Sequence, residues 1–173
     1  MIVGGIRIIQ MISVREEQGR LAELRDEVAS AFGEPHHGGA KGSIAFVDAE
    51  LGRIDELGPN LDAFFADWAA GPTMAVGVGL AAWVASAVTA AGDRQRAASL
   101  YADLLPFAGV GGHIANLSAP VDSALGELAA ALGRHDDAQR HHDDAVAFAE
   151  RLRAPRWIAR ATAARDALAT RGA

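Results

Sequence analysis

The chain has 173 residues and a formal net charge of −6, from 16 Lys and Arg residues against 22 Asp and Glu residues. This length suffices for one domain with a sizeable core, and the acidic balance argues against a general nucleic-acid surface. The absence of cysteine excludes disulfides, thiolate metal sites and a cysteine nucleophile. Alanine occupies 39 positions, and β-branched and aromatic residues hardly cluster, which is typical of an α-helical protein.

The helical period of apolar residues predicts a succession of helices along the whole chain. They are expected over residues 2–17, 20–32, 41–51, 53–69, 74–91, 93–105, 114–132, 134–152 and 156–170. Breaks fall at residues 33–39, at Gly71-Pro72, at residues 106–112 and at Ala154-Pro155. No segment alternates strictly between apolar and polar residues, so no strand is expected.

Two apolar stretches raise the question of export or membrane insertion. In the first, residues 1–14, Arg7 interrupts the apolar run, whereas a signal peptide would place its charge before that run. The second, Thr73 to Ala91, is near spanning length, but it consists mostly of Ala and Gly, and charged residues follow it. A buried helix is the better interpretation, and a soluble, cytoplasmic protein without membrane contact is expected.

Four predicted helices end at a glycine, which is followed by a charged residue and another helix. Glycine accepts the left-handed conformation that closes a helix, so the chain can reverse there. The glycines lie 33, 40 and 41 residues apart, at Gly19, Gly52, Gly92 and Gly133. Small or apolar residues follow at two fixed offsets, five residues on (Leu24, Leu57, Ala97 and Ala138) and twelve residues on (Ala31, Phe64, Leu104 and Ala145). Positions seven apart share a helix face, so each pair is predicted to pack on the preceding helix.

This pattern resembles that of tetratricopeptide-type helical hairpins. Four segments are also similar to the helical-repeat tail of large bacterial signalling ATPases: REEQGRLAEL (15–24), LYADLLPFA (100–108), LGRHDDA (132–138) and RAPRWIAR (153–160). In that family an adenylyl-cyclase-like or LuxR-type output domain is joined to a STAND-type ATPase and this tail. The resemblance covers nearly the whole chain but only the tail, so it implies no cyclase, nucleotide-binding or DNA-binding activity. The chain departs from the family at His135, usually aromatic there, and at residues 33–39, which are poor in apolar anchors.

The expected fold is therefore all-α, a right-handed superhelix of about four antiparallel helix pairs plus a C-terminal helix. It forms one tetratricopeptide-like domain over residues 1–173. Its expected repeats are residues 1–33, 39–70, 73–108 and 113–153, with a final helix over 155–171.

Three motifs could carry chemistry but have simpler structural interpretations. Gly77 to Ala82 fits the Gly-x-Gly-x-x-Ala dinucleotide fingerprint, but no strand precedes it and Asp93 follows too soon to bind a ribose. The glycine-rich loop 109–112 could offer amides to an anion, but no lysine is near, so a flexible connection is expected. No serine lies in a Gly-x-Ser-x-Gly context and no paired carboxylates stand out, so no enzymatic activity is expected.

The segment 135–144 is the only dense cluster of metal-ligand residue types. On a helix, Asp137, His141 and Asp144 would share one face, which leaves metal binding open. The favoured interpretation is a solvated helix face opposite Ala138 and Ala145. His36-His37, in a loop with Gly and Pro, is interpreted as a mobile linker, and no metal or cofactor is expected.

The expected function is a non-catalytic protein-interaction or ligand-sensing module. The resemblance implies the C-terminal regulatory part of a larger signalling or transcription-regulating ATPase; the alternative is a standalone small-molecule-binding or enzymatic helical domain. Stacked hairpins form a groove lined by the first helix of each pair, and a sparsely charged lining favours a peptide, another domain of the same polypeptide or a small apolar ligand. A homodimer through the apolar N-terminal helix is an open alternative. The residues predicted to face the groove are Ser13, Glu16, Phe46, Ala49, Ser86, Thr89, Ser123 and Glu127.

Overall fold

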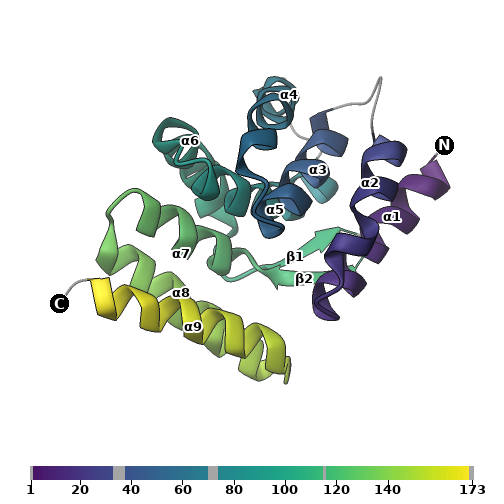
Figure 1. Ribbon diagram of the computed structural model, residues 1–173. Helices are drawn as coiled ribbons and strands as arrows, with labels where there is room; N and C mark the ends of the chain where they lie inside the picture. The colour runs from purple at the N-terminus through teal and green to yellow at the C-terminus, as the bar shows by residue number, and fades with distance from the viewer. Residues whose placement is uncertain (1, 33–37, 70–73, 115, 172–173) are drawn as a thin grey trace.

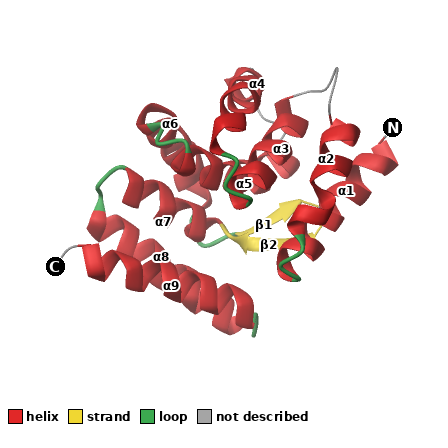
Figure 2. Ribbon diagram, in the orientation of Figure 1, coloured by secondary structure: helices red, strands yellow, loops and turns green. Residues whose placement is uncertain are grey.

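The computed structural model describes residues 2–32, 38–69, 74–114 and 116–171 (Figure 1). Helices joined by short turns make up most of these residues and one two-stranded hairpin is added to them, so the predicted all-α class is confirmed (Figure 2). The helices are α1 (Ile2–Glu17), α2 (Arg25–Phe32), α3 (Gly38–Glu50), α4 (Leu57–Ala69), α5 (Met74–Ala90), α6 (Arg94–Leu104), α7 (Val121–Ala131), α8 (His135–Arg151) and α9 (Pro155–Arg171). Short 3-10 turns lie at Leu21–Leu24, Ile54–Glu56 and Leu105–Phe107.

The four turn glycines adopt the left-handed conformation that the sequence predicts. Their φ angles are 66°, 72°, 68° and 77° at Gly19, Gly52, Gly92 and Gly133. At Gly92 the N–H donates to the carbonyl of Thr89 at 3.1 Å, and the Asp93 N–H donates to that of Val88 at 3.2 Å. The other three glycines repeat this pair of hydrogen bonds, which satisfies carbonyls that the helix end leaves unpaired. The same turn therefore folds the chain back four times.

The two offsets counted from these glycines select core positions. At the first offset, Leu24, Leu57, Ala97 and Ala138 are all buried, and at the second Phe64, Leu104 and Ala145 are buried as well. The prediction is wrong at Ala31, which is exposed. Ala31 lies in the last turn of α2 that the structure describes, and its side chain is exposed there.

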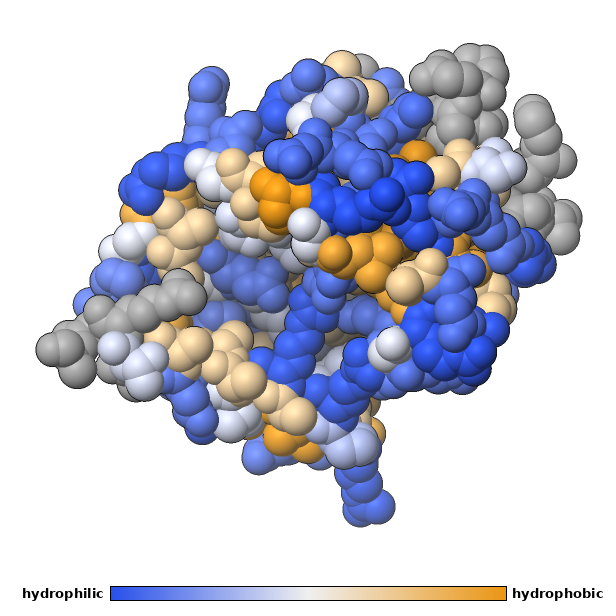
Figure 3. All heavy atoms as spheres, in the orientation of Figure 1, coloured by the Kyte–Doolittle hydropathy of each residue, from blue (hydrophilic) through white to orange (hydrophobic). Residues whose placement is uncertain are grey.

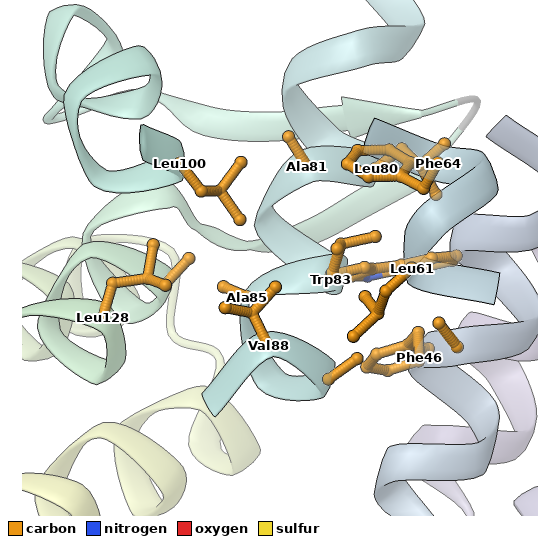
Figure 4. Close-up of a cluster of buried hydrophobic side chains, with 14 of the residues drawn as sticks. Phe46, Leu61, Phe64, Leu80, Ala81, Trp83, Ala85, Val88, Leu100 and Leu128 are labelled. Atoms are coloured by element: carbon orange, nitrogen blue, oxygen red, sulfur yellow. The ribbon is translucent and has the colours of Figure 1, made fainter. Parts of the chain in front are cut away.

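Helix α5 is the centre of the core, as the interpretation of its apolar stretch as a buried helix requires (Figure 4). It packs against α3, α6, α7 and the first hairpin strand, and Val84, Ala85 and Val88 are completely buried. The indole of Trp83 stacks on Phe46 of α3, with ring centroids 4.8 Å apart. The Gly77–Ala82 motif lies inside this helix, not at a strand-to-helix turn. In the described ranges, no helix has the length and apolar character needed to cross a membrane.

Residues 111–120 correct the expectation that the chain has no strand and that a helix spans 114–132. Strands β1 (Gly111–Ile114) and β2 (Asn116–Pro120) pair antiparallel, with Gly111 opposite Pro120 and His113 opposite Leu117. The helix begins only after Pro120, because a proline in a helix interior removes one hydrogen bond and clashes with the preceding turn. β1 packs on α5, and β2 contacts α1, α7 and α8, so the hairpin fills the space between the first and last helices.

Candidate functional site

A cavity of about 370 Å³ lies between α1, α3, α5, α7 and the start of α9. Figure 3 shows this face of the molecule hollowed between α9 and α5, with hydrophilic side chains along the hollow. The volume is within the range of small-molecule sites. The cavity is lined by Ser13, Glu16, Glu17, Phe46, Ala82, Trp83, Ser86, Ala119, Pro120, Ser123, Ala124, Glu127, Leu152, Ala154, Pro155, Arg156, Trp157 and Arg160.

Most residues predicted to face the groove meet at this cavity. They are Ser13, Glu16, Phe46, Ser86, Ser123 and Glu127. Counting back from each turn glycine selects the same face of successive first helices, which explains why they converge. Thr89 does not join them: it lines a separate depression beside Gly92, and its hydroxyl donates to the carbonyl of Ser86 at 2.9 Å. Ala49 is half-buried against the hydrophobic core.

Helix α9 contributes a wall that the sequence does not predict. Its first residues place Arg156, Trp157 and Arg160 against the cavity. The preceding turn resembles the glycine turns but has Arg153 in the left-handed conformation, with φ 54°. The Arg153 N–H donates to Glu150 and the Ala154 N–H donates to Ala149, each at 3.0 Å. The break at Ala154-Pro155 and the final helix are expected from the sequence, but a search for glycine cannot find this turn, and no local pattern predicts that α9 returns over the groove.

The cavity is rich in charge, which corrects the expectation of a sparsely charged lining. Arg160 Nη1 donates to Glu16 Oε1 of α1 at 2.8 Å, and Nη2 donates to Glu50 Oε1 of α3 at 3.1 Å. Nη2 also lies 3.6 Å from Glu127 Oε1 of α7. One guanidinium on the last helix therefore contacts carboxylates on three earlier helices. Nearby, Arg156 pairs with Glu17, with Nε and Oε1 3.6 Å apart.

The carboxylates outnumber the cations in this cluster. Three carboxylates around Arg160, whose side chains are only 20–26% exposed, leave a formal charge of −2 when all four groups are ionised. Burial raises the pKa of the Glu16 and Glu127 carboxyls, and the positive charge of Arg160 only partly opposes this. Burial alone would lower the pKa of Arg160, but the charges of Glu127, Glu50 and Glu16 raise it. The guanidinium therefore stays charged, and the carboxylates lack full compensation.

Buried histidines correct the interpretation of residues 135–144 as a solvated face. His141 and His142 are only 3% and 2% exposed, whereas His135, Asp136, Asp143 and Asp144 are exposed as expected. His141 can be buried because Nδ1 lies 2.8 Å from Asp122 Oδ1 and Nε2 lies 3.1 Å from the Tyr101 hydroxyl. The sequence does hold a signal for this burial, since both histidines fall three or four residues after the buried Ala138.

The glycine-rich loop supplies a partner for the same cluster. The Gly109 N–H donates to Asp122 Oδ2 at 2.6 Å, and Gly109 has a φ of 79°. The loop amide therefore does bind an anion, but the anion is the chain's own Asp122 carboxylate. This ordered turn replaces the flexible connection expected for residues 109–112.

Of the three residues proposed from the sequence as metal ligands, His141 and Asp144 lie together, but Asp137 does not join them. Asp137 pairs with Arg134 and Arg140 instead, and hydrogen bonds from these two guanidiniums lower the pKa of its carboxyl. In the described part of the chain, ligand atoms of Asp122, His141 and Asp144 lie within 4.8 Å of one another. Asp122 and His141 already bond each other, so a metal would have to replace existing hydrogen bonds. The cluster is best understood as a brace between α6, α7 and α8. His36-His37 lies outside the described residues.

Comparison of the chain with protein-family models, with curated proteins and with solved structures finds no match. The resemblance to tetratricopeptide-type tails of signalling ATPases therefore stays a prediction, and the chemistry of the cavity carries the functional argument.

Proposed function

We propose that this chain is a non-catalytic ligand-sensing module that holds a small molecule in the cavity between α1, α3, α5, α7 and α9. The observation that carries the proposal is the cavity itself, because the same face of successive helices lines it and α9 closes it. A ligand there would touch both ends of the chain at once. A bound ligand would stabilise the arrangement in which α9 covers the cavity. The more tightly the ligand binds this arrangement, the greater the stabilisation.

The proposal includes a tetratricopeptide-like, right-handed solenoid. Two observations support it: one turn geometry recurs at four glycines, and the first helices pack in succession, α3 on α5 and α5 on α7. Each second helix also contacts the next first helix, as α6 does α7 and α8 does α9. Such a stack of pairs forms a shared concave surface. Arg160 adds contacts from α9 back to α1 and α3, beyond the neighbouring pair.

The proposed setting is the one that the family resemblance implies, a regulatory part of a larger cytoplasmic signalling ATPase. Ligand binding would change how firmly α9 is held, and neighbouring domains would respond to that change. A peptide is a weaker candidate for the occupant, because α9 and the β1–β2 hairpin close the groove that an extended chain would need. The homodimer alternative is also weaker, since Ile8 and Ile12 of α1 are buried within the chain.

Binding of prodan, a neutral naphthalene dye whose emission shifts to the blue in apolar surroundings, tests this function. The intact chain should bind prodan saturably. Ser123→Phe fills the cavity with an aromatic ring and should weaken that binding at least about tenfold. The matched control, Asp136→Asn, changes an exposed residue far from the lining and should leave it unchanged. Equal prodan binding by the wild-type and Ser123→Phe proteins, both with helical circular dichroism, would contradict the proposal.

A further inference from the structure

We propose that the ligand of the cavity is an organic cation, an ammonium group carried on an apolar or aromatic body. This inference rests on the proposed function, since it names the chemical class that the same cavity would take. It follows from how charges are distributed over the lining, from how the two arginines are already engaged, and from the rings that share the cavity.

The two arginines at the cavity are engaged within the protein. Arg156 pairs with the side chain of Glu17, and its Nη1 also donates to the Glu17 carbonyl oxygen. Arg160 donates one hydrogen bond to Glu16 and one to Glu50. An anionic ligand would have to share these guanidiniums with carboxylates that already contact them, and it would lie beside the partly buried Glu16 and Glu127, whose negative charges repel it.

The carboxylates, in contrast, have capacity to spare. Glu127 forms an ion pair with Arg160 but no hydrogen bond, because its Oε1 is 3.6 Å from Arg160 Nη2, so its oxygens keep acceptor positions for a further donor. Its side chain lines the cavity and is 26% exposed, so a ligand can reach it. Glu16 also lines the cavity, 2.8 Å from the same guanidinium. An ammonium group has three donors and no acceptor, so it can donate to Glu127 and Glu16 together.

The remaining lining suits the apolar body of such a cation. Phe46 and Trp83 form a stacked pair with ring centroids 4.8 Å apart, and Trp157 enters from α9. Phe46 and Trp83 cover each other's faces and are buried, so they offer an apolar wall, and the half-buried Trp157 is the more accessible ring. Burial raises the pKa of the Glu16 and Glu127 carboxyls, and Arg160 opposes this rise only in part, so a second cation beside them would favour their ionised form.

Three probes with one aromatic body and different charges test the inference by calorimetry. They are phenethylammonium, the neutral phenethyl alcohol and the anionic phenylpropanoate. Phenethylammonium should bind the intact chain at least about tenfold more tightly than the alcohol, because its charged donor forms an ion pair with the carboxylate, whereas the alcohol donates as a neutral group. Phenylpropanoate should bind more weakly than both.

Substitution of Glu127 assigns the preference to a residue. Glu127→Gln keeps the shape of the side chain and should remove most of the preference for ammonium over alcohol. Asp144→Asn, which removes an exposed charge away from the lining, should keep it. If Glu127→Gln loses its helical circular dichroism, Glu16→Gln serves as the second variant with the same expected loss of preference.

The outcomes separate this inference from the proposed function. Equal affinity for alcohol and ammonium, or a preference that survives both glutamate substitutions, would overturn the cationic assignment. If prodan still binds and Ser123→Phe still weakens it, the ligand-sensing cavity stands while the ligand class fails. If neither prodan nor any probe binds, both proposals fail together.

Discussion

Arg160 of α9 donates a hydrogen bond to Glu16 of α1 at 2.8 Å, across 144 positions of the chain. The bond joins the first and last helices over the cavity. Glu50 accepts from the second nitrogen of the same guanidinium, at 3.1 Å. One side chain of α9 therefore contacts both α1 and α3, in addition to the packing of α9 on α8.

Arg160→Met should destabilise the fold, because it leaves Glu16, Glu50 and Glu127 close together without their cation. The expected loss is about 2 kcal/mol, less than for a fully buried ion pair, because the Arg160 side chain is 37% exposed. Urea unfolding measures it. The matched control is Arg165→Met on the same helix, whose partner Asp143 is 54% exposed and lies 3.6 Å away. That change should cost at most about 0.5 kcal/mol, and an equal cost for both variants would refute the role assigned to Arg160.

The pH dependence of stability should carry the sign set by Glu127. Burial raises its folded-state pKa above the ordinary value of 4.5, so the folded state holds its proton to higher pH than the unfolded state does. As pH rises above 4.5, the unfolded state ionises first and stability falls until the folded-state pKa is passed. Glu127→Gln removes this group. The free energy of unfolding of the variant, relative to that of the wild type, should therefore increase as the pH rises through this range.

The measurement is the free energy of unfolding of the two proteins across mildly acidic pH. Glu150→Gln removes an exposed carboxylate from α8 and is the charge-matched control. A difference in the free energy of unfolding between wild type and Glu127→Gln that does not change with pH would mean that burial does not raise the pKa of this carboxyl.

The helices and their turns could be predicted from the sequence because their causes are local. Gly92 closes a helix by its own conformational freedom, and Ala97 and Leu104 lie on one face through the helical period alone. The β1–β2 hairpin also had a local signal in Pro120, which cannot lie inside the helix expected over 114–132. Six of the residues that line the cavity were predicted in a similar way, by counting back along the helix from each turn glycine.

What could not be predicted depends on pairs far apart in the chain. Arg160 meets Glu16 and Glu50 only after the whole stack is built, and nothing near Arg160 in the sequence indicates those partners. His141 can be buried because it bonds Tyr101, which lies 40 positions away in the chain, and Asp122, which lies 19 positions away. The helical spacing from Ala138 places His141 on the buried face, but nothing in the local sequence identifies the partners that make its burial possible.

Removal of metal should leave the melting temperature unchanged. Asp122 and His141 are satisfied by each other, by Tyr101 and by Gly109, so no ion is needed to hold this cluster together. A metal present at 100 times its dissociation constant and bound only to the folded state would add about 2.7 kcal/mol. A fall of several degrees in the melting temperature on addition of EDTA would show that Asp122, His141 and Asp144 hold an ion.

The offset rule predicts a sharp contrast within α8. Ala138 is completely buried, so Ala138→Arg should overpack the interface with α7 and bury an unpaired charge, at a cost of at least about 3 kcal/mol. Asp136→Arg, two residues earlier and exposed, should change stability by at most about 0.5 kcal/mol. Thermal unfolding compares them. Similar melting temperatures for the two variants would show that the position five residues after Gly133 does not predict which side chain is packed in the core.

At the turn before α9, replacement of arginine by glycine should have opposite effects on stability at Arg153 and at Arg151. Arg153 has a φ of 54°, in the left-handed region that disfavours residues with a Cβ atom. Arg153→Gly should therefore stabilise the chain by about 0.5 kcal/mol, after the greater freedom of glycine in the unfolded state is subtracted. Arg151, two residues earlier, ends α8 with its guanidinium 5.4 Å from the centre of the Phe148 ring. Arg151→Gly loses that contact and helix propensity, and should cost about 1 kcal/mol.

Urea unfolding of the two variants gives opposite signs if this account is right. A loss of stability in Arg153→Gly would mean that the Arg153 side chain contributes more than its backbone conformation costs. The turn that brings α9 over the cavity would then depend on that side chain, and not on the left-handed conformation that it shares with the four glycine turns.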